Sequence, residues 1–238
     1  MIGKDFDIQK AQTQIDIVPK TEQYTIDLNL TNPNIFVKDL NIFPDILSTF
    51  STNYVNNPNR TINLMIASEK INGTVIMPGE TFSFNQVVGE RTIAGGYKNA
   101  AIFVNGEVED GLAGGICQIS STLYDAVIGA NLEITERHNH SKLTSYLSGG
   151  KDATVVWGRY DFQFKNNREY PIKVEMSVQN GVATATICGI KTNEEYDINI
   201  ESQCIGVSGV YTIYHAYKVY YQNGVEVKRE FLSRDLYK

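Results

Sequence analysis

The spacing of apolar residues along the chain predicts two helices. One begins just after Cys117, where apolar residues recur every three or four positions and form a single stripe. That stripe consists of Leu123, Ala126, Val127 and Ala130. The other helix is predicted over residues 59–73, with Asn59 as its N-cap and Gly73 at its end. Its stripe consists of Ile62, Met65, Ile66 and Ile71.

Alternation of apolar and polar residues predicts strands over much of the remaining chain. A strand is predicted at 24–30, and a hairpin around Asn105-Gly106. Downstream of Cys117 the predicted strands are 134–140, 142–147, 152–157, 160–164, 172–178, 182–188, 216–221 and 225–232. Asn180-Gly181 and Asn223-Gly224 are typical of two-residue hairpin turns. A helix followed by such a meander predicts an α+β fold with helices packed on a mainly antiparallel sheet.

Composition and charge exclude some classes of partner. The 238 residues carry a formal net charge of −6 and no cluster of Lys or Arg, so nucleic acid is not an expected partner. No apolar run reaches the length of a membrane span, and no signal peptide is visible. We therefore expect contact with a membrane only through an N-terminal anchor that this chain does not contain.

Two glycines precede Cys117 at the predicted start of its helix. Gly114 and Gly115 permit a tight turn and a close backbone approach. Unpaired N–H groups and the helix dipole then favour a thiolate, and the same amides suit an oxyanion. Cys117 is therefore the predicted nucleophile, and the alternative is a small core cysteine. A disulfide between Cys188 and Cys204 is also conceivable and would leave Cys117 unpaired.

A cysteine nucleophile needs a base, and a third group usually orients that base. His138 and His140 share one face of a predicted strand. We expect His140 to be the base and Asp152 its orienting group, with Asp161 as the substitute for Asp152. The alternatives are a surface histidine and an aspartate that caps a turn. A cysteine helix followed by His and Asp strands has the chain order of papain- and transglutaminase-like folds.

The sequence gives only weak indications of a metal site or of a serine nucleophile. Cys117, His138 and His140 are possible zinc ligands, but no CxxC or HExxH motif accompanies them, so we expect no metal and no cofactor. Ser120 lacks the G-x-S-x-G motif of a serine nucleophile. We assign it instead to the lining of the site or to the backbone of the first helical turn. His215 has no partner motif and receives no role.

Seven segments, in this order, resemble the VanW family. They are Arg-Thr-Ile-Asn at 60–63, Asn-Gly at 72–73, Pro-Gly-Glu-Thr-Phe-Ser-Phe-Asn at 78–85, Gly-Gly-Ile-Cys-Gln-Ile-Ser-Ser-Thr-Leu-Tyr at 114–124, Arg-His-Asn-His-Ser at 137–141, Asp-Ala-Thr-Val at 152–155 and Asp-Phe-Gln-Phe-Lys-Asn at 161–166. The resemblance covers a domain at residues 48–190. Residues 1–47 form an appendage that weakly resembles the end of a peptidoglycan-binding-like region. Residues 191–238 form a β-hairpin extension that resembles part of a G5 domain.

The resemblance implies a cellular location and a catalytic activity. Family members are found in Gram-positive cell envelopes, often behind a membrane anchor, so an extracytoplasmic location is implied. Some VanW domains are L,D-transpeptidases that cross-link peptidoglycan stem peptides through a cysteine acyl-enzyme, which implies Cys117 as nucleophile with His140 and Asp152. The substrate-contacting residues that we expect are Gly115, Gln118, Ser120, His138 and Asp161. A non-catalytic envelope module linked to glycopeptide resistance, and a cysteine peptidase or amidase, remain the alternatives.

Overall fold

The computed structural model describes residues 3–5, 29–31, 42–104, 107–192 and 195–238. The chain divides into two compact units, Met1–Ile42 and Phe43–Lys238. In the first unit, β1 (Gly3–Asp5) pairs antiparallel with β2 (Asn29–Thr31). Most of the strand predicted at 24–30 lies outside the described residues. The predicted three-part division, with boundaries after residues 47 and 190, stays a prediction.

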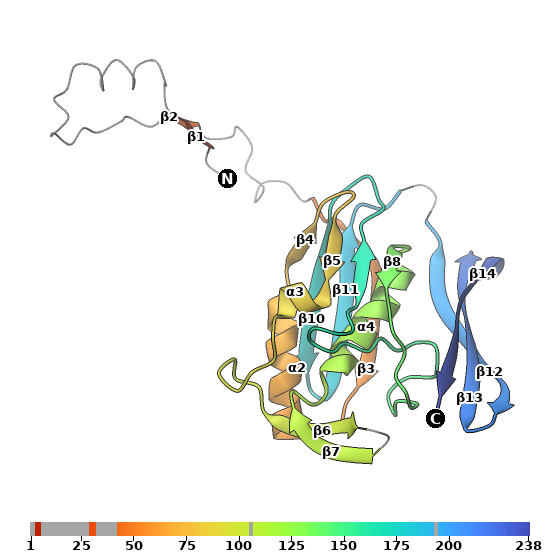
Figure 1. The fold of residues 1–238 in the computed structure, drawn as a ribbon. Helices are drawn as coiled ribbons and strands as arrows, with labels where there is room; N and C mark the ends of the chain where they lie inside the picture. The colour runs from red at the N-terminus through yellow and green to blue at the C-terminus, as the bar shows by residue number, and fades with distance from the viewer. Residues whose placement is uncertain (1–2, 6–28, 32–41, 105–106, 193–194) are drawn as a thin grey trace. The chain divides into compact units, whose positions relative to one another are not determined.

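The second unit contains the three helices that the structure describes (Figure 1). They are α2 (Pro58–Ile71), α3 (Phe84–Val88) and α4 (Ile116–Gly129). The strands before α4 are β3 (Asp45–Asn53), β4 (Thr74–Ile76), β5 (Thr81–Ser83), β6 (Asn99–Val104) and β7 (Glu107–Leu112). Those after α4 are β8 (Glu133–Glu136), β9 (Gln163–Lys165), β10 (Ile172–Gln179), β11 (Val182–Gly189), β12 (Asp197–Ser208), β13 (Tyr211–Gln222) and β14 (Val225–Tyr237). None of these helices is long and apolar enough to cross a membrane.

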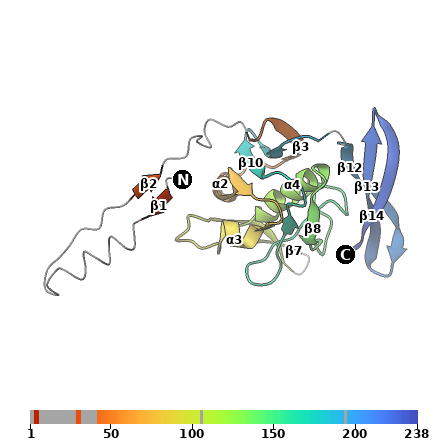
Figure 2. The same ribbon diagram turned by 90° about the horizontal axis from the view of Figure 1, so that it is seen from above.

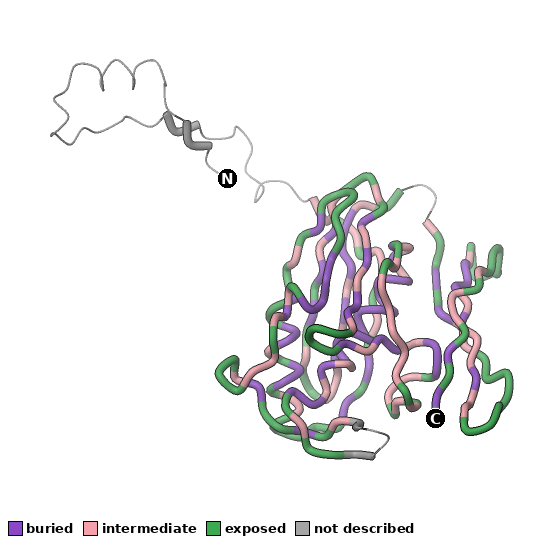
Figure 3. Tube along the Cα trace, viewed as in Figure 1, coloured by how far each residue is buried: buried purple, intermediate pink, exposed green. Residues whose placement is uncertain are grey.

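A sheet of four antiparallel strands, in the order β3-β11-β10-β4, forms the centre of the second unit. Because side chains alternate along a strand, Ala183, Ala185 and Ile187 of β11 all face the core and are buried. α2 contacts β10, and α4 contacts both β3 and β11. The buried residues accordingly follow these helices and this sheet (Figure 3).

The predicted fold class is wrong. The other strands form separate small antiparallel sheets, in the orders β12-β13-β14, β5-β9-β8 and β6-β7, and do not extend one large sheet on which helices pack. The sheet of β12–β14 lies beside α4, which contacts β12 (Figure 2). With three short helices and many antiparallel strands, the described chain is mostly β structure and does not have a papain-like α+β fold.

The segment that follows α4 explains part of this error. The strand predicted at 134–140 ends at Glu136, and residues 142–147 and 152–157 form no strand of their own. In this loop the His140 backbone N–H donates to the Asp152 carboxylate at 2.6 Å. A side chain thus accepts the hydrogen bond that a backbone carbonyl of a neighbouring strand would accept in a sheet. His140 and Asp152 therefore lie on one loop and not on adjacent strands.

The two long helices agree with the sequence to different degrees. In α4 the predicted stripe is buried, from Leu123 to Ala130. The N-cap of α2 is Asn57 and not the predicted Asn59, whose backbone N–H donates to the Asn57 side chain. In α2 the side chains of Ile62 and Met65 are exposed, with relative exposures of 38% and 42%. Its buried apolar residues are Leu64, Ala67 and Ile71, of which only Ile71 belongs to the predicted stripe.

Asn63 explains why the buried face of α2 differs from the predicted one. Its buried amide donates to Lys98 O at 2.9 Å and to Gly114 O at 3.1 Å, and it accepts from the Lys98 N–H at 2.8 Å. A polar side chain that binds the backbone in this way turns inward, and two residues of the predicted stripe, Ile62 and Met65, consequently face solvent.

The predicted hairpins are confirmed. Asn180-Gly181 joins β10 to β11, and Asn223-Gly224 joins β13 to β14, with positive φ at all four positions. β6 pairs with β7 as predicted, although the turn at 105–106 lies outside the described residues. All three cysteines are free, so the disulfide between Cys188 and Cys204 is not formed.

Candidate active site

The turn into α4 depends on the glycine pair. Gly115 is the N-cap, with a φ of 104° in the left-handed region that favours glycine. A Cβ on Gly114 would lie 2.4 Å from Ala100 O, so no side chain fits there. The pair thus brings the chain past β6 and places Cys117 in the first turn of α4. The Cys117 N–H donates to no backbone acceptor among the described residues, as expected at a helix start.

The Cys117 thiol is partly buried and lines the same pocket as the His140 side chain. Its Sγ also lies 3.5 Å from Val155 O. Burial by itself raises the pKa of this thiol. The hydrogen bond and positive charge of His140, with smaller contributions from Val155 and Arg91, outweigh burial and bring the pKa below its usual value. The environment of Cys117 therefore favours the thiolate.

His140 lies between Cys117 and Asp152. Its Nδ1 is 2.6 Å from Asp152 Oδ2, which leaves Nε2 for the hydrogen bond with Cys117. Burial by itself lowers the pKa of His140, but hydrogen bonds to Asp152 and Cys117, and the charges of both, raise it to about 10. The three side chains form the connected row that a nucleophile, a base and an orienting carboxylate require.

Asp152 is itself held by groups from β14 and from the residue before His138. Its Oδ1 accepts from the Tyr237 hydroxyl at 2.5 Å and from Arg137 Nη2 at 3.2 Å. Arg137 Nη1 also donates to both carboxylate oxygens of Asp235, at 2.8 and 2.7 Å. Burial raises the pKa of Asp152, but its contacts with His140, Arg137 and Tyr237 outweigh burial and lower it. Asp152 is therefore held as a carboxylate.

Arg137, Asp235 and Tyr237 are the residues that sequence reasoning missed. Arg137 directly precedes the two histidines in the sequence, and a cation next to a candidate base was a signal for it. Tyr237 had no such signal, because 85 positions separate it from Asp152.

Two serines of α4 hold the loop that carries Asp152. The Ser120 hydroxyl donates to Ala153 O at 2.6 Å, and the Ser121 hydroxyl accepts from the Ala153 N–H at 2.9 Å. Both serines are fully buried. Ser120 was a predicted substrate contact, but these bonds give it a part in positioning the loop.

The other predicted contacts divide into two groups. Gly115 and Gln118 lie in the wall of the pocket around Cys117, although the Gln118 amide is buried and already bonded to Arg60, Thr52 and Asn53.

His138 and Asp161 do not line the pocket that contains Cys117. The His138 Nε2 contacts Glu136 Oε1 at 3.0 Å, and Asp161 accepts from the Ser83 hydroxyl at 2.5 Å and the Asn85 N–H at 2.8 Å. Asp152, and not its substitute Asp161, is the carboxylate that contacts His140. The catalytic and binding roles of all these residues remain predictions.

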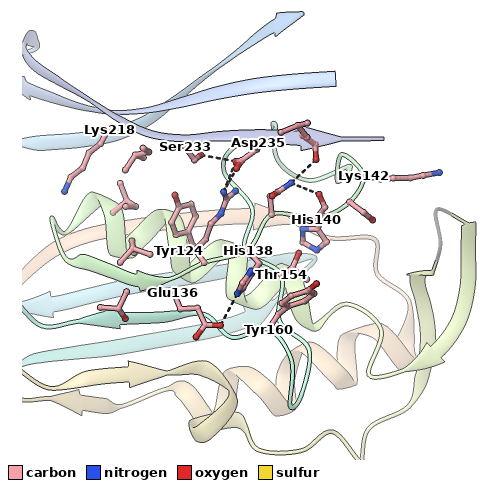
Figure 4. Close-up of a pocket in the computed structure, with 18 of the residues that line it drawn as sticks. Tyr124, Glu136, His138, His140, Lys142, Thr154, Tyr160, Lys218, Ser233 and Asp235 are labelled. Carbon is pink, nitrogen blue, oxygen red and sulfur yellow. Dashed lines mark hydrogen bonds and ion pairs between the residues drawn. The ribbon is translucent and has the colours of Figure 1, made fainter. Parts of the chain in front are cut away.

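Two cavities meet at His140. Cys117 lines a pocket of about 440 Å³, whose wall also contains Tyr146 and Trp157. The other is a polar cleft of about 1000 Å³ on the side of β8 and β14, lined by His138 and Asp235 among others (Figure 4). His140 and Thr154 line both cavities. Among the described residues, no group of three or more His, Cys, Asp or Glu side chains is arranged to hold a metal ion.

Comparison with known proteins identifies relatives of this chain. The model of the family described as "VanW like protein" matches residues 59–188. An uncharacterized protein of Bacillus subtilis (strain 168), YoaR, is 42% identical over 166 residues, which is 64% of this chain and 55% of the relative. The vancomycin B-type resistance protein VanW of Enterococcus faecalis (strain ATCC 700802 / V583) is 29% identical over 127 residues, which is 51% of this chain and 46% of the relative.

The chain thus spans about half the length of the curated relatives that it matches. No solved structure matches it. The matched segment contains Cys117, His140 and Asp152 but ends before β14, which carries Asp235 and Tyr237.

Proposed function

This chain belongs to the VanW family, and on that premise we propose that it acts in the bacterial cell envelope as a cysteine-dependent acyl transferase. Its substrates are peptidoglycan stem peptides, which it cross-links in the manner of an L,D-transpeptidase. Membership of the VanW family and the name of the Enterococcus faecalis relative, a vancomycin resistance protein, support a role at the cell wall.

One observation carries the chemical part of this proposal, namely the row formed by Cys117, His140 and Asp152. A structural cysteine has no need of a hydrogen-bonded histidine, a buried carboxylate behind that histidine and a thiol pKa below its usual value. Cys117 and His140 also line a pocket that is large enough for a peptide segment.

The first half of the reaction forms a thioester. The Cys117 thiolate attacks the carbonyl carbon of the donor peptide, and the N–H of Cys117 at the start of α4 donates to the oxyanion. The C–N bond then breaks, and the departing amine takes the proton of the His140 imidazolium. Asp152 keeps the ring in place and stabilises its charged form.

The second half resolves the thioester. An acceptor amine attacks the same carbonyl, His140 takes the proton from that amine, and the C–S bond breaks to regenerate the Cys117 thiolate. If water takes the place of the amine, the same residues make a peptidase. The products distinguish the two reactions, because the first joins two peptides and the second releases a free carboxylate.

Mass spectrometry of the intact protein after incubation with purified muropeptides tests the proposal. We expect an acyl adduct on Cys117 that is lost in Cys117→Ala. Cys204→Ala is the matched control, because Cys204 is a free and exposed cysteine outside the pocket. Wild-type protein that forms neither adduct nor product from donor and acceptor peptides would refute the transferase and favour a non-catalytic envelope module.

A further inference from the structure

The pocket that contains Cys117 also contains two guanidinium groups, those of Arg60 and Arg91. Both are partly buried, yet among the described residues neither forms an ion pair with a carboxylate. The carboxylate of the pocket wall, Glu90, is exposed, and no contact joins it to either arginine. Since Cys117 and His140 balance each other as thiolate and imidazolium, the pocket holds an excess of positive charge.

Arg60 extends from α2 over the start of α4. A Cβ on Gly115 would lie 3.1 Å from Arg60 Nη1, so the guanidinium lies directly against the turn before Cys117. Its Nη2 donates to Gln118 Oε1 at 2.8 Å, and this amide is neutral. Gln118 is in turn held by Thr52 and Asn53, which fixes the position of the guanidinium.

Arg91 is fixed by one of its two terminal nitrogens. Nη1 donates to Asn85 Oδ1 at 2.7 Å and to Gly89 O at 3.1 Å, and both acceptors are neutral. Nη2 is buried and has no hydrogen-bond partner among the described residues. A buried charged donor without a partner costs free energy, unless a ligand supplies the acceptor. Burial lowers the pKa of both arginines, and the nearby anionic groups, Cys117 for both arginines and Asp161 for Arg91, raise it by less than burial lowers it.

We propose that Arg60 and Arg91 form a carboxylate subsite that selects an acyl donor with a free carboxylate close to the carbonyl that Cys117 attacks. This inference rests on the proposed acyl-transfer function and names the substrate class for it. A guanidinium binds a carboxylate through two parallel N–H···O bonds, which gives both charge and orientation. The apolar wall beside it, with Ile102, Val155 and Trp157, suits the aliphatic part of such a peptide.

Alkylation of Cys117 tests the subsite without any turnover. The Cys117 thiolate attacks the CH2 carbon of iodoacetate or iodoacetamide and displaces iodide. The two reagents differ only in that one has a carboxylate and the other a neutral amide. We therefore use the rate with iodoacetate divided by the rate with iodoacetamide, both measured in the same variant. This ratio does not depend on how much of the thiol is present as thiolate. We expect the ratio to be higher at Cys117 than at the exposed Cys204 of the same protein, and to fall about tenfold or more in Arg60→Gln and Arg91→Gln.

Arg159→Gln is the matched control, because it removes one exposed arginine outside this pocket. We expect it to leave the ratio unchanged. A ratio that is equal at Cys117 and Cys204, or that does not respond to Arg60→Gln and Arg91→Gln, would overturn the carboxylate subsite.

A pair of donor peptides, one with a free carboxylate and one with a carboxamide in its place, extends the test to the substrate. We expect kcat/KM for the carboxylate donor to exceed that for the carboxamide donor, and Arg60→Gln to abolish the difference. Equal acylation by both donors would overturn the subsite and leave the transferase intact. Acylation by neither donor, with an alkylation ratio that depends on the arginines, would refute the transferase and leave the subsite intact.

Discussion

Replacing Asp152 with Asn removes the negative charge that holds His140 and leaves a side chain of nearly the same shape. In the folded protein Asp152 Oδ2 lies 2.6 Å from His140 Nδ1 and also accepts the His140 backbone N–H at 2.6 Å. An Asn oxygen in the position of Oδ2 can keep both contacts but cannot stabilise the imidazolium by charge. We therefore expect the His140 pKa to fall, the Cys117 pKa to rise and turnover to decrease.

The size of the effect follows from the lost charge. A hydrogen bond to a charged group contributes roughly 1.5–3 kcal/mol, and about 1.4 kcal/mol corresponds to one pKa unit. The His140 pKa, about 10 in the wild type, should therefore fall by roughly one to two units in Asp152→Asn. Since the imidazolium stabilises the thiolate, the rate of Cys117 alkylation at neutral pH should fall as well.

Nuclear magnetic resonance titration of the imidazole rings measures this change directly, because the chain has only three histidines. Asp161→Asn is the control, since Asp161 contacts Ser83 and Asn85 and not His140, and it should leave the titration unchanged. A His140 pKa that stays near 10 in Asp152→Asn would show that the carboxylate does not hold the imidazolium.

Two further predictions concern the stability of the fold around the site. Tyr237→Phe removes a hydroxyl that donates to Asp152 and accepts from the Gly150 N–H. The free energy of unfolding, measured in urea, should therefore fall by roughly 1–3 kcal/mol. Tyr214→Phe is the control, and an equal loss of stability in both variants would contradict this role for the Tyr237 hydroxyl. The second concerns pH. Folding raises the pKa of His140 and lowers that of Cys117, so between about pH 6.5 and 8.5, the pKa values of the unfolded groups, the two contributions to stability oppose each other as the pH rises. From about pH 8.5 to 10, His140 binds a proton in the folded state but not in the unfolded state, so the free energy of unfolding should fall by about 2 kcal/mol as the pH rises. A similar fall in His140→Gln would contradict the assignment of this effect to His140.

The sequence by itself determined the local features of this protein. Gly114 and Gly115 specify the turn into α4, because one lacks space for a Cβ and the other adopts a positive φ. The stripe of α4 and the Asn-Gly hairpins follow from patterns of a few residues, and the structure confirms them. Cys117, His140 and Asp152 were chosen from residue type and order along the chain, and the structure brings them into contact.

Only the tertiary structure decided which groups support that row and where its loop lies. The partners of Asp152 and Arg137 on β14, Tyr237 and Asp235, are 85 and 98 positions away along the chain. The inward face of α2 depends on Asn63, whose backbone partners lie 35 and 51 positions away. The predicted strands between β8 and β9 became a loop because side-chain hydrogen bonds took the place of strand pairing. Local periodicity reports which face of a segment is apolar, whereas bonds between distant polar groups depend on how the folded elements meet.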